Sequence, residues 1–320
     1  MGYRALAAGL ALFTLSFTQV TAQTRPVSCP ETAQYYAKDS INVVTFGAST
    51  IEGVKGLSFQ DYLKANFERC YGGKSINIYN YGIGGQTTRQ GLERLDIALA
   101  GKTGFMVIDM GINDAFAIID KKLKIEETES NMRQIIQRSL AAGLVPIICT
   151  LQTINDTNSG RYRRANIVVD QLNKIYIKLA AEYKINHADI NRFFKRDFSL
   201  YQDDLHPNAK GYRLISYILF DTINRIIAKR FLQFTVNQNY PNPGFNKTTI
   251  DVILPDAQNL QIKIYDTQGR LVRTVIDEFL NSGIQSFDID LSNMAPGIYI
   301  YKAIAGDGDY KVTKKMIVAH

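Results

Sequence analysis

In the stretch INVVTFGAST, residues 41–50, a series of mostly apolar and β-branched residues is followed directly by a glycine, an alanine and a serine. Residues 41–46 have the composition of a buried β-strand. Gly47 allows a tight turn that would leave Ser49 accessible at the end of that strand. Two further apolar runs, at residues 105–110 and 145–150, have a similar pattern. Residues 76–81 also indicate a strand, and residues 185–190 indicate a last, weaker one. Strands that are apolar throughout favour a parallel sheet covered on both faces.

Helical periodicity occupies most of the segments between these strands. The predicted helices are residues 59–70, 88–100, 126–142, 164–183 and 208–230. Gly143 follows the third helix as a C-terminal cap would, and Asn208 is a natural N-cap for the last. Alternating strands and helices predict an α/β fold with helices on both faces of the sheet. In such folds ligands bind at the carboxyl ends of the strands.

Polar segments lie where those strands end. Three of them contain glycine and follow strands, at residues 47–50, 82–86 and 111–114, and a fourth, residues 203–208, precedes the last helix. Ser49 is a candidate nucleophile. His206 is a candidate base, and Asp203, three residues earlier, could orient its ring. The α/β-hydrolase elbow G-x-S-x-G is excluded, because Ile51 stands where the second glycine belongs.

Acyl transfer also needs hydrogen-bond donors for the developing oxyanion. Gly84 and Gly85 allow close approach of a backbone N–H, and Asn113 offers a side-chain amide. Phe116 and Ile118 follow Asn113 and could line a substrate pocket, although packing in a helix core explains them equally well.

These segments together resemble the SGNH/GDSL hydrolase family, in its arylesterase and lysophospholipase/thioesterase I-like branch. The resemblance rests on four blocks: Gly47-Ala48-Ser49, Asn80-x-Gly82-x-x-Gly85-x-Thr87, Gly111-Ile112-Asn113-Asp114 and Asp203-Asp204-Leu205-His206-Pro207-Asn208. It implies a flavodoxin-like α/β/α sandwich with a parallel sheet. It further implies Ser49 as nucleophile, His206 as general base and Asp203 as its partner. The implied oxyanion donors are the N–H groups of Ser49 and Gly85 and the amide of Asn113. The family usually has Asp where this chain has Ala48.

The composition is that of an ordinary globular protein, with 320 residues, 46% hydrophobic, and a formal net charge of +7. Three histidines and three cysteines make a His- or Cys-rich metal site unexpected, and we predict no metal and no cofactor. No zinc-finger spacing or Lys/Arg block indicates nucleic-acid binding. Cys29 and Cys70 could pair in an oxidising compartment, whereas Cys149 lies in an apolar run and is expected to be a buried thiol.

Both ends of the chain indicate export. Residues 1–22 read as a secretory signal peptide, with an apolar stretch at residues 5–17 that is too short to span a membrane. A tail at residues 23–39 would then precede a hydrolase domain at residues 40–232. A linker at residues 233–238 leads to a C-terminal domain at residues 239–320. We therefore expect a secreted or cell-surface protein whose mature form does not span a membrane.

The C-terminal domain shows period-two alternation in short runs separated by turn residues, which is typical of a small all-β sandwich. It resembles the sorting domain of type IX secretion. The matching residues are Tyr240-Pro241-Asn242-Pro243, Ile264-Tyr265-Asp266 with Gly269-Arg270, Ala295-Pro296-Gly297-Ile298-Tyr299 and Lys314-Lys315-Met316-Ile317-Val318. The resemblance implies the type IX secretion machinery as a partner. A fibronectin-like accessory or carbohydrate-binding module is the alternative.

These predictions combine into a secreted serine esterase that hydrolyses carboxylic esters through an acyl-serine intermediate. Short-chain or aryl esters and lysophospholipids fit the family branch. Two alternatives stay open: a polysaccharide O-acetyl esterase, and a non-catalytic surface glycan-binding or adhesin protein built on a hydrolase fold.

Overall fold

A parallel β-sheet forms the centre of the first part of the molecule. The computed structural model describes residues 27–319, so the predicted signal peptide lies outside the described residues. The strands are β1 (Ser40–Gly47), β2 (Ser75–Gly82), β3 (Phe105–Asp109), β4 (Val145–Cys149) and β5 (Asn186–Ala188). Their order is β2-β1-β3-β4-β5, and all neighbours are parallel. This doubly wound order confirms the predicted flavodoxin-like fold.

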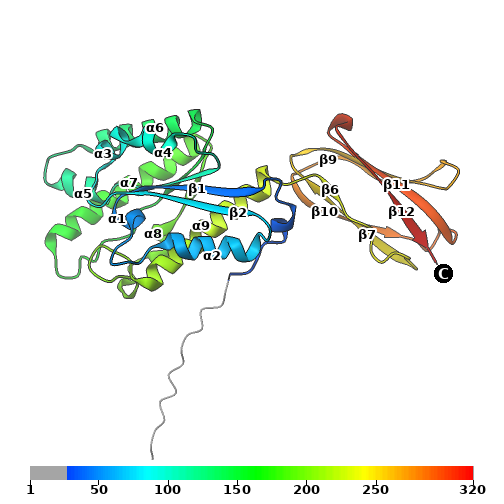
Figure 1. Ribbon diagram of the computed structural model, residues 1–320, viewed down its shortest axis with the longest axis horizontal. Helices are drawn as coiled ribbons and strands as arrows, with labels where there is room; N and C mark the ends of the chain where they lie inside the picture. Colours follow the sequence, from blue (N-terminus) through cyan, green and yellow to red (C-terminus); the bar gives the residue numbers. More distant parts are fainter. Residues whose placement is uncertain (1–26, 320) are drawn as a thin grey trace, which may run out of the picture.

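Helices cover both faces of this sheet (Figure 1). One face carries α2 (Phe59–Cys70), α8 (Ile190–Phe194) and α9 (Ala209–Arg230). The other carries α3 (Thr88–Glu93), α4 (Leu95–Leu99), α5 (Ile112–Ile119), α6 (Ile125–Ala141) and α7 (Gly160–Glu182). Consecutive residues of β1 serve both layers, because Val43 lies in the core under α9 and Val44 in the core under α7. Burial on both faces explains why the central strands β1, β3 and β4 are largely apolar, whereas the edge strands β2 and β5 carry polar residues.

The structure differs from the prediction at three of these helices. The predicted helix 88–100 is broken at Arg94, whose backbone leaves the helical region and separates α3 from α4. The segment after Gly111, which the sequence indicated only as a polar stretch at the end of a strand, is the helix α5. Helix α7 starts four residues before the predicted start, because the Ser159 side chain accepts a hydrogen bond from the N–H of Tyr162 and caps it.

A disulfide fixes the first described residues to helix α2. Cys29 and Cys70 are bonded, which joins the segment before the short helix η1 (Glu31–Tyr35) to the last residue of α2. Cys149 is free and buried, as its apolar surroundings in the sequence predict.

The C-terminal part consists of two antiparallel sheets that enclose a separate core. One has the order β10-β7-β6 and the other β12-β11-β8-β9. The strands are β6 (Thr235–Val236), β7 (Lys247–Leu254), β8 (Gln258–Tyr265), β9 (Leu271–Leu280), β10 (Gly283–Asp290), β11 (Gly297–Ala305) and β12 (Tyr310–Val318). This confirms the predicted all-β fold. Part of the predicted linker is itself a strand, since β6 pairs with β7.

The two parts contact each other through the N-terminal segment. The N–H of Gln233 donates to the carbonyl oxygen of Tyr35 at 2.8 Å, and the Asn237 amide donates to the Tyr35 hydroxyl at 2.9 Å. Ile253 of β7 is buried in the same apolar cluster as α2 and α9. Across residues 27–319, no helix has the length and apolar character needed to cross a bilayer.

Removing the disulfide by Cys29→Ser/Cys70→Ser should destabilise the first part of the chain. The two cysteines are 41 residues apart in sequence, and releasing a loop of that length corresponds to a loss of about 4 kcal/mol in the chain-entropy account. Urea unfolding of the wild-type and double-variant proteins measures this difference. Equal unfolding midpoints would contradict it.

Candidate active site

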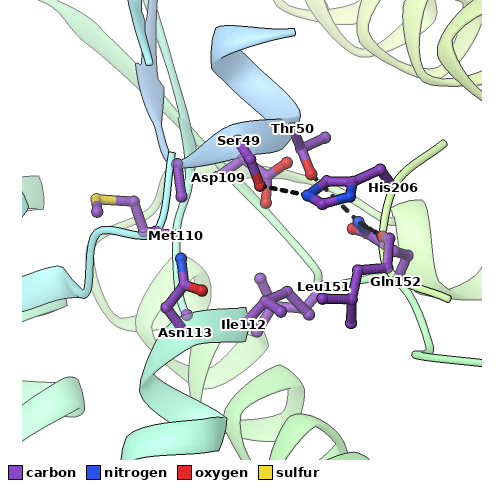
Figure 2. A pocket seen from close by; sticks show the side chains of 13 residues that line it. Ser49, Thr50, Asp109, Met110, Ile112, Asn113, Leu151, Gln152 and His206 are labelled. Carbon is purple, nitrogen blue, oxygen red and sulfur yellow. Dashed lines mark hydrogen bonds between the residues drawn. The ribbon is translucent and has the colours of Figure 1, made fainter. Parts of the chain in front are cut away.

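Ser49 is the first residue of a one-turn helix that follows β1 directly. β1 ends at Gly47, and α1 spans Ser49–Glu52. The turn is tight, because a Cβ built on Gly47 would lie 2.2 Å from the carbonyl oxygen of Asp109. A larger residue at position 47 would therefore push β1 away from β3. Ser49 faces a cavity at the carboxyl edge of the sheet (Figure 2).

His206 and Asp203 lie in the loop before α9 and reach Ser49 from the opposite side of this cavity. The Nε2 atom of His206 lies 3.0 Å from Ser49 Oγ, and its Nδ1 atom lies 2.9 Å from Asp203 Oδ2. A carboxylate at Nδ1 holds the ring proton there and leaves the lone pair of Nε2 facing the hydroxyl. The three residues thus form a continuous hydrogen-bonded chain.

Asp203 is held in its ionised form. Partial burial opposes ionisation, but the backbone N–H of Leu205 and the ring of His206 more than offset it, so that the pKa of Asp203 lies below its usual value. The neighbouring Asp204 takes no part, because its Oδ1 accepts a hydrogen bond from the Asn155 amide at 3.0 Å. The structure therefore brings Asp203, and not Asp204, to the imidazole.

Two of the predicted oxyanion donors line the same cavity as Ser49. Gly85 has a φ of +77°, and its N–H meets no acceptor anywhere between residues 27 and 319. The N–H of Gly84 is already used, since it donates to Glu52 Oε2 at 2.9 Å. Asn113 donates one amide hydrogen to the carbonyl oxygen of Gln86 at 3.0 Å, which fixes the side chain and leaves its second hydrogen available.

Helix α5 carries Asn113 and is anchored by the next residue. Asp114 is fully buried and accepts hydrogen bonds from the backbone N–H and hydroxyl of Thr88 and from the hydroxyl of Thr128. Burial raises the pKa of Asp114 while these hydrogen bonds oppose the rise. Asp114 thus ties α5 to α3 and α6, and in this way holds the Asn113 amide at the edge of the sheet.

The Arg94 side chain connects the ends of β1 and β2. Its guanidinium donates to the carbonyl oxygens of Gly47 and Tyr81, each at 2.9 Å, and also to the side chain of Gln86. The guanidinium carbon lies 4.4 Å from the centre of the Phe46 ring. One cation therefore holds together the turn that carries Ser49 and the loop that carries Gly85. No motif in the sequence around Arg94 indicates this role.

The cavity itself is small, with a volume of about 210 Å³. Its apolar wall includes Ile112, Leu151 and Leu205, and buried polar groups of Thr50, Asp109 and Gln152 also line it. The only feature of the sequence that pointed to these lining residues was their position in or next to the polar segments described above.

Phe116 and Ile118 do not line this cavity. Both pack against the core under α7, and the Phe116 ring lies 5.6 Å from that of Tyr162 and 4.7 Å from the guanidinium carbon of Arg161. The helical turn of α5 accounts for this, because it directs Ile112 and Asn113 toward the sheet edge and the later residues elsewhere. These two side chains thus pack in the helix core, which was the alternative to a place in the substrate pocket.

Asp109 is an acidic group that none of the predicted site residues uses. It is 5% exposed, and within the described part of the chain no donor or cation contacts its carboxyl group. Burial raises its pKa to about 7. Asp109 lines the same cavity as Ser49 (Figure 2).

Comparison with known proteins agrees with this architecture. Residues 45–214, more than half of the chain, match the GDSL-like lipase/acylhydrolase family, and residues 238–319 match the secretion system C-terminal sorting domain. A lipase/acylhydrolase from Enterococcus faecalis is 22% identical, with a TM-score of 0.51, over 58% of this chain and 96% of that one. The acetylxylan esterase Axe2 from Geobacillus stearothermophilus is 19% identical, with a TM-score of 0.49, over 57% and 94%. No curated protein matches the sequence.

Asp109→Asn should change how stability depends on pH. The pKa is raised from 3.8 to about 7 in the folded protein. The stabilisation from this proton is therefore complete below about pH 4 and is lost as the pH rises through about 7. A shift of this size corresponds to about 4 kcal/mol. Chemical unfolding at several pH values should show the wild type losing up to that amount relative to the variant. A difference that does not vary with pH would contradict the assignment.

Proposed function

Because this chain belongs to the GDSL-like lipase/acylhydrolase family, we propose that it is a serine esterase that hydrolyses carboxylic esters through an acyl-serine intermediate. The observation that carries the proposal is the chain of short contacts from Ser49 through His206 to Asp203, at 3.0 Å and 2.9 Å. Within residues 27–319 no other serine has a histidine ring at hydrogen-bond distance. A non-catalytic binding protein would not need this arrangement.

The first half of the reaction follows from these contacts. His206 Nε2 removes the proton from Ser49 Oγ as that oxygen attacks the ester carbonyl carbon. The negative charge that develops on the carbonyl oxygen is stabilised by the N–H groups of Ser49 and Gly85 and by the Asn113 amide. Asp203 stabilises the imidazolium ion without taking its proton.

The second half regenerates the enzyme. The tetrahedral intermediate collapses, the bond to the leaving alcohol breaks, and His206 gives its proton to that oxygen. A water molecule, deprotonated by the same Nε2 atom, then attacks the acyl-serine carbonyl. Release of the carboxylic acid returns the proton to Ser49 Oγ.

The cavity favours a short acyl group. Its volume of about 210 Å³ is below the range of roughly 300–1,000 Å³ typical of pockets that enclose drug-sized ligands. Buried polar side chains, Asp109 and Gln152, line it together with the apolar ones. A long alkyl chain would gain little there, because apolar atoms would displace hydration from these groups without replacing it. We therefore favour short-chain esters, including O-acetyl groups, over lysophospholipids.

Export to the cell surface or the extracellular space is indicated by the sorting domain at residues 238–319. We propose that residues 1–22 act as the signal peptide that begins this route. The type IX secretion machinery would then recognise the β-sandwich part of the chain.

Ser49→Ala and Asn113→Ala should reduce the rate of ester hydrolysis by very different factors. Removing the nucleophile should reduce kcat by about 10⁶, as for a catalytic unit. Removing one oxyanion donor should reduce it by about 10²–10³. Hydrolysis of p-nitrophenyl acetate by the full chain measures both. Esterase activity that survives Ser49→Ala would refute the mechanism.

The chain-length profile should fall steeply with acyl length. We expect kcat/KM to be highest for p-nitrophenyl acetate and to decrease from butyrate to longer esters, because the cavity is short and partly polar. Ester hydrolysis across this series, with Ser49→Ala as the blank, provides the measurement. A maximum at long acyl chains would favour lysophospholipid-type substrates instead.

A further inference from the structure

A second and larger hollow lies along the free edge of the parallel sheet. Its volume is about 530 Å³, and it shares no lining residue with the cavity at Ser49. This volume lies within the range of roughly 300–1,000 Å³ typical of ligand sites. The hollow is lined by β5, by the start of α8 and by the middle of α9. Because β5 pairs only with β4, its outer side is open. We call this hollow the edge site.

Several polar groups of the edge site have no partner in the folded chain. Between residues 27 and 319, no hydrogen bond or ion pair involves the side chains of Asn186, His187, Arg192 and Tyr217. His187 and Tyr217 are only partly exposed, and both line this hollow together with Asn186 and Arg192. A recess lined by several unsatisfied donors and acceptors is suited to a ligand rich in hydroxyl groups.

Each acidic group that lines the edge site already has a partner within the protein. Asp221 Oδ2 lies 3.2 Å from the guanidinium of Arg225, and Asp189 Oδ1 accepts a hydrogen bond from the Thr150 hydroxyl at 3.0 Å. Arg192 is therefore the one of the two lining arginines that has no ion-pair partner between residues 27 and 319, while Asp189 keeps its negative charge. A guanidinium presents paired N–H donors in one plane, which match the two oxygens of a carboxylate.

Phe193 adds an apolar surface next to that charge. Its side chain is 55% exposed, although large aromatic side chains are usually buried. A pyranose ring has C–H groups on one face and hydroxyl groups around its rim. It can therefore stack on the Phe193 ring while its hydroxyls bond to Asn186 and Tyr217.

We propose that the edge site binds a uronic acid residue of an acidic polysaccharide, with its carboxylate on Arg192 and its ring against Phe193. The site stands apart from the chemistry at Ser49. It would hold the polymer on the enzyme and raise the local concentration of its ester groups at the catalytic cavity.

The test is affinity gel electrophoresis of the full chain in gels that contain polygalacturonate or dextran, at about 0.15 M salt, where long-range charge effects are screened. We expect polygalacturonate to retard the wild type and dextran to leave it unaffected. Arg192→Ala should weaken binding about tenfold or more, as for the loss of one charge-assisted pair. Phe193→Ala should weaken it by a smaller factor. Arg192→Lys keeps the charge but loses the paired donors, so its affinity for polygalacturonate should be close to that of Arg192→Ala.

Arg164→Ala is the matched control, because Arg164 is exposed on α7 and lies outside the edge site. It should bind like the wild type. Equal losses in Arg164→Ala and Arg192→Ala would show a non-specific charge effect and overturn the proposal. So would unchanged binding in Arg192→Ala, or equal retardation by dextran. Hydrolysis of p-nitrophenyl acetate should be unchanged in all these variants. The gel measures binding and does not depend on catalysis. A wild-type protein without esterase activity would therefore refute the proposed function, while its retardation by polygalacturonate would still test the edge site.

Discussion

The catalytic arrangement depends on the parallel register of β1 with both of its neighbours. Gly47, the last residue of β1, pairs with Gly82 of β2 and with Asp109 of β3. The strand ends are packed without spare room, because a Cβ on Gly82 would lie 2.0 Å from the backbone nitrogen of Glu52 in α1. Three strands thus end at one level, and the segments that follow them must meet. Arg94 then holds two of these ends through their carbonyl oxygens.

The base approaches from a loop that is braced against the segment after β4. The N–H of Asn155 donates to the carbonyl oxygen of Asp204 at 2.9 Å, and the N–H of Gln202 donates to that of His206 at 2.9 Å. The Tyr201 hydroxyl donates to the carbonyl oxygen of Thr153 at 2.5 Å. These contacts restrain the backbone on both sides of Asp203, so the imidazole is held toward Ser49 by main-chain hydrogen bonds as well as by its carboxylate. Such pre-organisation reduces the reorganisation needed during the reaction.

The sequence predicted the elements whose pattern is local. The central strands β1, β3 and β4 were evident because both of their faces are largely buried. The placement of Ser49, Asp203 and His206 followed from strand ends and a three-residue spacing. The break at Arg94 could not be read, because residues 88–100 have a continuous helical period and the break depends on contacts with β1 and β2. The cavity wall was also missed. Whether Ile112 or Phe116 faces the substrate depends on how α5 is anchored by Asp114, which is a tertiary contact.

The central claim is that Ser49 forms a covalent bond with the substrate. A fluorophosphonate reacts with a serine only when a neighbouring base activates it, and mass spectrometry of the digested protein locates the adduct. We expect one adduct, on the peptide that contains Ser49, and none when His206 is replaced by alanine. Covalent bonding at Ser49 would be contradicted if the reagent abolished esterase activity while labelling another residue, or without labelling the protein at all.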